Sequence, residues 1–428
     1  MKIGIIGGTS GLGETLAIIL KKHDFEINIS GTNHVKGEKI ASKIGVNYIK
    51  ENKDLASLSD ILIVSVPIDK TNTVIKEVSD SMNEGSVMID VTSIKEEPTL
   101  TMEKYLPDNV EYIPTHPIFG PRTPDLENQV IVLTPNKKGK WYLKILNFLN
   151  NQNMRVIETT ASKHDEMMSI VQVLTHFSYI STASAIEKIN VDIKETEDFE
   201  SPIYKLMIDM IARIVSQNPF LTYYIQSKNK NGNYIRSIFS KSVLELEETI
   251  LNEDIDKFVE IANKATENMG DIQSALGRSD KALTSLNHEY KLLQEAIGLE
   301  IGLKNIYSNE IHFGVLKEIN SKNILLDNNI SIDYSHYELL TNDELLQWKM
   351  ANLGKIEYTL SCVFKGNVNS GIISKTIEKI DGVIDCKIVQ ENKLENNEVS
   401  LKFKVIGLNE EFSSDVNDLI SGFSGKII

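Results

Sequence analysis

The N-terminal stretch Lys2–Thr15, KIGIIGGTSGLGET, constrains the fold more than any other part of the chain. A short β-branched run enters a cluster of glycines, and an amphipathic helical pattern follows at once. In the order strand, tight turn and helix, the glycines let the backbone approach a pyrophosphate, and the N–H groups of the helix start point at the anion. Gly8 and Gly13 occupy the outer positions of the G-x-G-x-x-G pattern, and Ser10 stands at the middle one. Because serine is small and its hydroxyl can donate to phosphate, this turn predicts dinucleotide binding.

The end of the second expected strand, residues 26–30, bears on the choice between NAD and NADP. Sites that prefer NAD usually place an acid here to accept from the ribose 2′-hydroxyl. No Asp or Glu occurs between Ile27 and Gly37, where hydroxyl, amide and ammonium donors stand instead. These donors suit a 2′-phosphate and modestly favour NADP, although Thr and Asn can also serve a ribose without phosphate. The expected cofactor contacts are Gly8, Thr9, Ser10, Gly11, Leu12, Gly13, Thr32, Asn33, Lys36, Val66 and Pro67.

Hydrophobic periodicity divides the chain into an α/β part and a helical part. Strand and helix patterns alternate to about residue 158, and the continuously apolar run 61–64 is typical of a strand covered on both faces of a parallel sheet. We therefore expect a doubly wound, Rossmann-type domain over residues 1–158. Apolar residues spaced three and four apart then predict an all-α domain over residues 159–308, with helices over residues 163–189, 202–217, 233–251 and 254–276. Such a domain beside a dinucleotide fold usually supplies the substrate pocket and often a homodimer interface.

Two smaller units are expected after the helical domain. Residues 309–354 read as a small β unit with a closing helix, to which the sequence assigns no chemistry. Residues 355–428 show the order strand, helix, strand, strand, helix, strand of a ferredoxin-like α+β module. Cys362 and Cys386, the two cysteines of the chain, fall in strands of this module. They are expected to be small buried core residues rather than disulfide partners or metal ligands.

Net charge and hydropathy exclude several classes of partner. The net charge of −15 argues against nucleic acids and anionic membranes, since both need a cationic footprint. The sequence shows neither a signal peptide nor an apolar run of membrane-spanning length, which favours a cytoplasmic protein.

Three stretches carry residues suited to chemistry. The first is Asp90–Lys95, DVTSIK, at the end of an expected strand, and the second is THPIFGP, which holds His116 between prolines and a glycine. The third is a helix with His164, Gln172 and His176. Gln172 and His176 are four residues apart, so they share a helix face and can meet one ligand. Neither a nucleophile motif nor a metal-ligand spacing accompanies these histidines.

These stretches, in this order behind a dinucleotide fold, resemble the prephenate dehydrogenase family. The matching signatures are the glycine turn, residues 90–95, residues 116–121, residues 164–177, and a later helix, residues 204–219, with Arg213 in the place of the family's substrate arginine. The resemblance covers about residues 1–280. The C-terminal module also looks like the ACT-type regulatory domain appended to some members.

The resemblance implies a reaction and a role for each candidate residue. Prephenate would be oxidised to 4-hydroxyphenylpyruvate with NAD(P)⁺ in tyrosine biosynthesis, and aromatisation would drive the loss of CO₂ without a metal. His116 would accept the hydroxyl proton, and Ser93 would hydrogen-bond the hydroxyl or the nicotinamide. Arg213 would pair with a substrate carboxylate, while His176 and Gln172 would line the pocket. Tyrosine would bind the C-terminal module and inhibit.

Two departures from the family pattern leave the substrate open. Arg122 follows the H-P-x-x-G motif where some members have an acid, and it is either a contact for the pyruvyl carboxylate or an exposed loop residue. Tyr179 stands where one branch carries a second histidine. Arogenate, which has an amino group in place of the side-chain keto group, is therefore the alternative substrate. The rival functions are another NADP-dependent reductase of the same superfamily and a non-enzymatic sensor of a small ligand.

Overall fold

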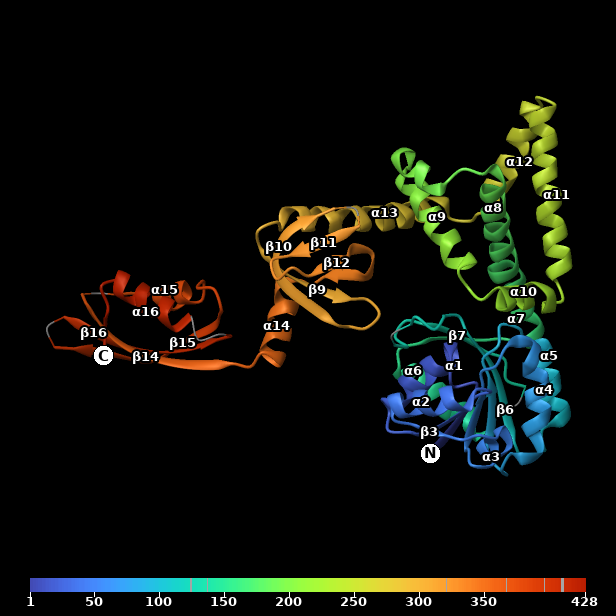
Figure 1. The fold of residues 1–428 in the computed structure, drawn as a ribbon, viewed down its shortest axis with the longest axis horizontal. Helices are drawn as coiled ribbons and strands as arrows, with labels where there is room; N and C mark the ends of the chain where they lie inside the picture. The colour runs from blue at the N-terminus through green and yellow to red at the C-terminus, as the bar shows by residue number, and fades with distance from the viewer. Residues whose placement is uncertain (124, 137, 321, 367, 396, 409–411) are drawn as a thin grey trace. The chain divides into compact units, whose positions relative to one another are not determined.

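The computed structural model describes residues 1–428 apart from 124, 137, 321, 367, 396 and 409–411. The chain forms two compact units, Met1–Thr284 and Ser285–Ile428, each of which is described by itself (Figure 1). Within the described residues, none of the helices combines the length and apolarity needed to cross a membrane.

An eight-stranded sheet forms the centre of the N-terminal domain, in the order β3-β2-β1-β4-β5-β6-β7-β8. Neighbouring strands run parallel except for the antiparallel pair β6 and β7. The doubly wound fold expected from the sequence is confirmed, although the short edge strands β3 and β8 carry too few apolar residues to have been predicted. The strands are β1 (Lys2–Ile6), β2 (Glu26–Ser30), β3 (Asn47–Tyr48), β4 (Ile61–Val64), β5 (Val87–Asp90), β6 (Glu111–Pro117), β7 (Val130–Leu133) and β8 (Arg155–Glu158).

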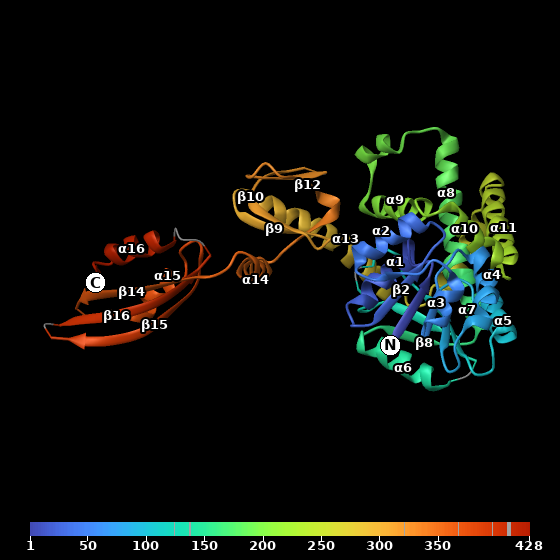
Figure 2. The same cartoon turned by 60° about the horizontal axis from the view of Figure 1, so that its bottom comes forward.

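Helices cover both faces of this sheet (Figure 2). Because side chains alternate along a strand, β4 supplies both cores: Ile61 and Ile63 pack with α1 and α6, whereas Leu62 and Val64 pack with α3 and α4. β4 is apolar at every position because both of its faces are buried. The helices are α1 (Gly11–Lys21), α2 (His34–Ile44), α3 (Asn52–Ser57), α4 (Ile68–Val78), α5 (Glu96–Tyr105) and α6 (Lys140–Asn151), with a 3-10 turn at Ser79–Ser81.

The rest of the first unit is helical. The helix expected over 163–189 is continuous, but a π-helical turn, Ser169–Leu174, separates α7 (Ala161–Met168) from α8 (Thr175–Ile189). The single helix expected over 254–276 is wrong, because the chain breaks near Gly270, whose φ of 71° ends helical geometry. The remaining elements are a 3-10 segment (Ile193–Phe199), α9 (Pro202–Val215), α10 (Pro219–Lys228), α11 (Gly232–Leu251), α12 (Ile255–Glu267) and α13 (Ile272–Glu295), the last of which continues past Thr284 into the second unit.

The second unit contains a five-stranded antiparallel sheet in the order β12-β11-β10-β9-β13. Its first strand precedes residue 309, so the sheet begins earlier in the chain than the expected β unit. A Cβ on Gly302 would lie 2.8 Å from the end of the Leu345 side chain, so the first strand packs closely against that side chain. The elements are β9 (Glu300–Asn305), β10 (Ile311–Ile319), β11 (Asn323–Leu326), β12 (Ser331–Asp333), the turn Tyr334–His336, β13 (Tyr337–Leu339) and α14 (Asn342–Asn352).

The C-terminal module has the expected ferredoxin-like element order, with its sheet arranged β15-β16-β14-β17. Cys362 and Cys386 are free thiols in its core, as expected. Burial raises the pKa of each thiol to about 11. The elements are β14 (Ile356–Lys365), α15 (Ser370–Ile377), β15 (Val383–Leu394), β16 (Glu398–Gly407), α16 (Phe412–Gly422) and β17 (Lys426–Ile427).

Candidate active site

The glycine turn between β1 and α1 is held against the end of β2. The N–H groups of Gly7 and Gly8 both donate to the Ser30 carbonyl oxygen at 3.1 Å. A Cβ on Gly13 would lie 2.3 Å from the Gly7 carbonyl oxygen, so only glycine lets α1 approach β1 this closely. Ser10 precedes α1 in an extended conformation, and its side chain makes no capping hydrogen bond. The N–H groups at the start of α1 are thus left to an anion, and these residues fit a dinucleotide pyrophosphate.

The other expected cofactor residues lie at the carboxyl ends of β2 and β4. Thr32, Asn33 and Lys36 are exposed around the start of α2, and the Asn33 side chain caps that helix by accepting from the Lys36 N–H at 3.0 Å. The first turn of α2 contains no acid, so its N-terminal end is favourable for a negative group. Pro67 is exposed at the start of α4, and Val66 precedes it.

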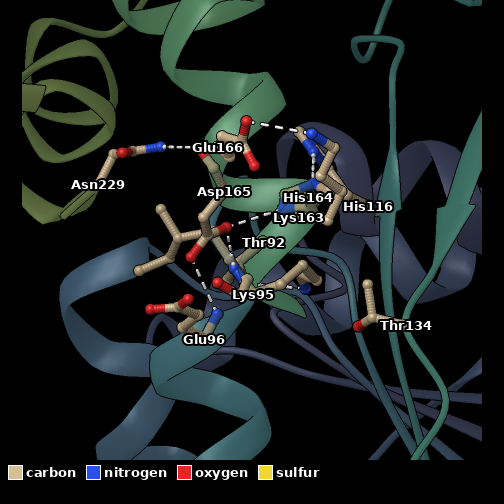
Figure 3. A network of polar contacts seen from close by, with 12 residues as sticks. Thr92, Lys95, Glu96, His116, Thr134, Lys163, His164, Asp165, Glu166 and Asn229 are labelled. Atoms are coloured by element: carbon tan, nitrogen blue, oxygen red, sulfur yellow. Dashed lines mark hydrogen bonds and ion pairs between the residues drawn. The ribbon is translucent and has the colours of Figure 1, made fainter. Parts of the chain in front are cut away.

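His116 lies at the end of β6 and is 3% exposed. Figure 3 shows its ring facing that of His164 on α7, with 2.8 Å between His116 Nδ1 and His164 Nε2. The other ring nitrogen of His164, Nδ1, lies 2.8 Å from Asp165 Oδ1. On the remaining side of His116, Nε2 lies 3.4 Å from the Gln172 side-chain nitrogen. Burial, with smaller contributions from His164 and Lys95, holds the pKa of His116 well below its ordinary value, so the ring is neutral near pH 7.

A second cluster ties the end of β5 to the strand of His116. The buried Lys95 ammonium pairs with the Asp90 carboxylate and donates to the Thr115 carbonyl oxygen at 2.6 Å. The Thr115 hydroxyl in turn donates to the Asp90 carbonyl oxygen at 2.7 Å. Burial lowers the pKa of Lys95, although the neighbouring Asp90 opposes that shift. The cluster thereby fixes the backbone one residue before His116.

The π-helical turn brings a polar side chain to His116. Gln172 lies within this turn, and π turns inside α-helices are frequent at functional sites. The Gln172 Oε1 and the Nδ1 of buried His176 have no hydrogen-bond partner among the described residues. Buried polar atoms without partners call for a ligand or water, so this helix face is suited to a polar substrate. Burial also lowers the pKa of His176.

The remaining candidates are less closely placed. Ser93 is half-buried in the loop between β5 and α5, and no described hydrogen bond joins it to His116. Arg122 is exposed after β6, one residue past Pro121, whose carbonyl oxygen accepts from the Thr15 hydroxyl at 3.0 Å. Arg213 is exposed in the last turn of α9, and no contact within the described chain joins it to the His116 cluster. That Arg213 and His116 meet one substrate therefore stays a prediction.

Sequence reasoning gave no role to three residues that contact this site. His164 and Asp165 were recognised only as a family signature, and Lys95 only as part of a strand-end stretch. The adjacent histidine and aspartate could have drawn attention, because a carboxylate commonly orients an imidazole. The lysine gave little signal, since most lysines are exposed.

The fold and this site together define a class of protein. A Rossmann-type sheet whose glycine turn leads into a helix without a side-chain cap, with a buried neutral histidine at the carboxyl edge of that sheet, is typical of dinucleotide-dependent enzymes.

The comparisons give the family. Residues 16–158 match the family description "Prephenate dehydrogenase, nucleotide-binding domain", and residues 160–264 match "Prephenate dehydrogenase, dimerization domain". The chain is 38% identical over its whole length to a probable arogenate/prephenate dehydrogenase of Methanocaldococcus jannaschii, 98% of which is covered. It is 26% identical to the T-protein of Haemophilus influenzae, over 70% of this chain and 73% of that protein. The chain belongs to the prephenate dehydrogenase family, and it is an oxidoreductase that uses a nicotinamide cofactor.

A solved structure agrees in fold. Prephenate dehydrogenase from Aquifex aeolicus, in a complex with hydroxyphenyl propionate and NAD⁺, superimposes with a TM-score of 0.51 at 21% identity. The match covers 64% of this chain and 98% of that one.

Proposed function

We propose that this chain oxidises prephenate to 4-hydroxyphenylpyruvate with release of CO₂, with NADP⁺ modestly favoured over NAD⁺. Residues 1–158 would bind the cofactor, and residues 159–308 would supply the substrate pocket. The observation that carries the proposal is the neutral, buried His116 with Nε2 directed at the Gln172 amide, at the sheet edge that holds the glycine turn. Arogenate is the alternative substrate, because the Methanocaldococcus jannaschii relative is described as a probable arogenate/prephenate dehydrogenase.

In the proposed mechanism His116 is the general base. Its Nε2 accepts the proton of the ring hydroxyl, and its low pKa keeps the lone pair available near pH 7. A positioned base of this kind contributes about 10²–10⁴-fold to the rate. A nicotinamide cofactor held by the glycine turn and by the carboxyl ends of β2 and β4 would supply the hydride acceptor.

Other residues of the chain would orient the substrate. Gln172 and His176 would offer it polar atoms that have no hydrogen-bond partner among the described residues, and Ser93 would hydrogen-bond its hydroxyl. Arg213 and Arg122 are the candidates for its two carboxylates, because a guanidinium fork matches a carboxylate in geometry and charge. As the ring carboxylate leaves as CO₂, its bonding electrons enter the ring, which becomes aromatic.

The test is to follow nicotinamide reduction with prephenate or arogenate and with NAD⁺ or NADP⁺. His116→Asn is expected to lower turnover by about 10²–10⁴-fold and to leave cofactor affinity nearly unchanged. His288→Asn, a change at an exposed histidine of the second unit, is the matched control. Unchanged turnover in His116→Asn would remove this histidine from the mechanism.

Assembly and regulation complete the proposal. Large apolar side chains on α11 and α12 are exposed, among them Leu244 at 61%, Leu251 at 77% and Ile255 at 74%, which supports a homodimer through the helical domain. The C-terminal module, residues 355–428, would act as an ACT-like domain that binds tyrosine and inhibits. Tyrosine inhibition that survives deletion of these residues would instead indicate competition at the active site.

A further inference from the structure

We propose that His164 and Asp165 are positioning residues that keep the ring proton of His116 on Nδ1 and so leave a lone pair on Nε2, which can act as the base. The inference rests on the proposed function in one respect, namely that His116 is the base. A series of hydrogen bonds would account for the reactivity of that histidine. The series runs from the start of α5 through the imidazoles of His164 and His116 to the nitrogen that would face the substrate.

The series is anchored at Asp165. Its carboxylate accepts from the backbone N–H of Lys95 at 2.8 Å and from that of Glu96 at 3.0 Å, as well as meeting His164 (Figure 3). Both N–H groups belong to the start of α5, where the helix end favours a negative charge. The Asp165 backbone is held in turn, because its carbonyl oxygen accepts from the Asn229 side-chain amide at 2.7 Å. The carboxylate therefore has a fixed position with its oxygens committed.

The placement of protons follows from counting donors and acceptors. A carboxylate offers only acceptors, so the nitrogen of His164 that faces Asp165, Nδ1, must carry the proton. A neutral imidazole has one N–H, which leaves a lone pair on His164 Nε2. The 2.8 Å contact to His116 is then a hydrogen bond only if His116 Nδ1 is the donor. His116 Nε2 is left with a lone pair, and it is the nitrogen that faces the Gln172 amide.

Replacement of the Asp165 carboxylate by an amide would allow both imidazoles to change tautomer. In Asp165→Asn the side-chain amide N–H can turn toward Nδ1, so that His164 holds its proton on Nε2 and donates to His116 Nδ1. His116 would then carry its own proton on Nε2, where the substrate hydroxyl needs a lone pair. The comparable change in a Ser-His-Asp triad, aspartate to asparagine, lowers turnover about 10⁴-fold through the wrong tautomer.

The competing explanation is that these contacts only join α7 to α5. The two explanations differ in what a conservative replacement preserves. Glutamine in place of His164 can present a carbonyl oxygen where Nε2 stood and still accept from His116 Nδ1, whereas phenylalanine fills the space without an acceptor. A structural role would make the two replacements equally harmful or equally harmless to turnover.

The experiment uses the full chain and compares Asp165→Asn, His164→Gln and His164→Phe with wild type. Turnover is expected to fall about 10²–10⁴-fold in Asp165→Asn and His164→Phe, while the KM for the nicotinamide cofactor stays within about twofold. His164→Gln is expected to recover at least about tenfold over His164→Phe. Asp333→Asn, which removes a carboxylate 3.9 Å from His336 in the second unit, is the matched control and should behave as wild type.

A second readout does not depend on turnover. Nitrogen-15 chemical shifts of labelled histidines report which ring nitrogen carries the proton, and they are expected to place the proton of His116 on Nδ1 in the wild-type chain. A proton found on Nε2 would overturn the inference, as would equal turnover of His164→Gln and His164→Phe. If wild type reduces neither cofactor with either substrate, the proposed function fails, and the nitrogen shifts still judge the positioning role by themselves.

Discussion

Replacement of Lys95 by methionine is expected to destabilise the first unit by about 3–5 kcal/mol, the cost of leaving a buried charge without its partner. The Lys95 ammonium and the Asp90 carboxylate are both fully buried. In the variant, the Asp90 carboxylate still accepts a hydrogen bond from the Thr92 backbone N–H at 3.1 Å. It loses the positive charge of Lys95, however, and it is buried from water. The Thr115 carbonyl oxygen loses a donor as well. Methionine fills a similar volume, so little of the expected loss comes from a cavity.

Urea unfolding can assign this loss to the first unit. The two tryptophans are divided between the units, so Trp141 reports on the first unit alone in a Trp348→Phe background. The double variant Asp90→Asn/Lys95→Met removes both charges and is expected to recover about half or more of the loss, since neutral replacement of a buried pair is often tolerated. The exposed change Lys50→Met should stay within about 0.5 kcal/mol of wild type. A loss below about 1 kcal/mol in Lys95→Met would refute the reasoning.

Three further predictions concern the cofactor turn, pH and cofactor choice. Gly13→Ala forces a Cβ against the Gly7 carbonyl oxygen and is expected to cost about 1–3 kcal/mol and to weaken cofactor binding, as urea unfolding and a cofactor titration would measure. Burial holds the pKa of His116 and His176 below 6.5, so the unfolded chain binds more protons at mildly acidic pH. Stability therefore falls as the pH drops below about 6.5, by up to about 1.4 kcal/mol per pH unit for each histidine, and less steeply in His176→Gln. Lys36→Ala should raise the KM for NADP⁺ at least about tenfold and leave that for NAD⁺ unchanged, because hydrogen bonds to charged groups contribute about 1.5–3 kcal/mol.

Each of these predictions has a control or a contradicting result. Gly277→Ala adds a Cβ that meets nothing within 4 Å and should leave cofactor binding unchanged. Equal pH dependence of stability in wild type and His176→Gln would contradict the burial argument. Equal effects of Lys36→Ala on both cofactors would remove Lys36 from recognition of the 2′-phosphate.

Local patterns carried most of what the sequence could predict. The glycine turn, the apolar strand buried on both faces and the H-P-x-x-G loop can be predicted because each is defined by a few residues adjacent in the sequence. The contact between His116 and His164 joins positions 48 residues apart, and only the packing of α7 against the sheet decides it. The buried Lys95 could not be predicted for the same reason, because its partners Asp90 and Thr115 come together only when β5 and β6 pair.

The rotation of side chains around the helix axis also limits what can be predicted from the sequence. At the α-helical period, the twelve residues from His164 to His176 rotate by about 1200°, which predicts that both side chains lie on roughly the same side of the helix. The turn Ser169–Leu174 is, however, wound more loosely than an α-helix. Rotation counted at the α-helical period therefore misplaces every residue after this turn relative to those before it. The same loose turn is what directs Gln172 toward His116.

The π-helical turn also explains how one continuous helix can pack against two different elements. The part before it, α7, packs against α5 of the nucleotide-binding domain, and the part after it, α8, packs against α9. In an uninterrupted α-helix, the direction of the contact face of one half would fix the direction of the contact face of the other half. The wider turn lets each half keep its own orientation, so deletion of one residue between 169 and 174 would swing one of the two contact faces by roughly 100°.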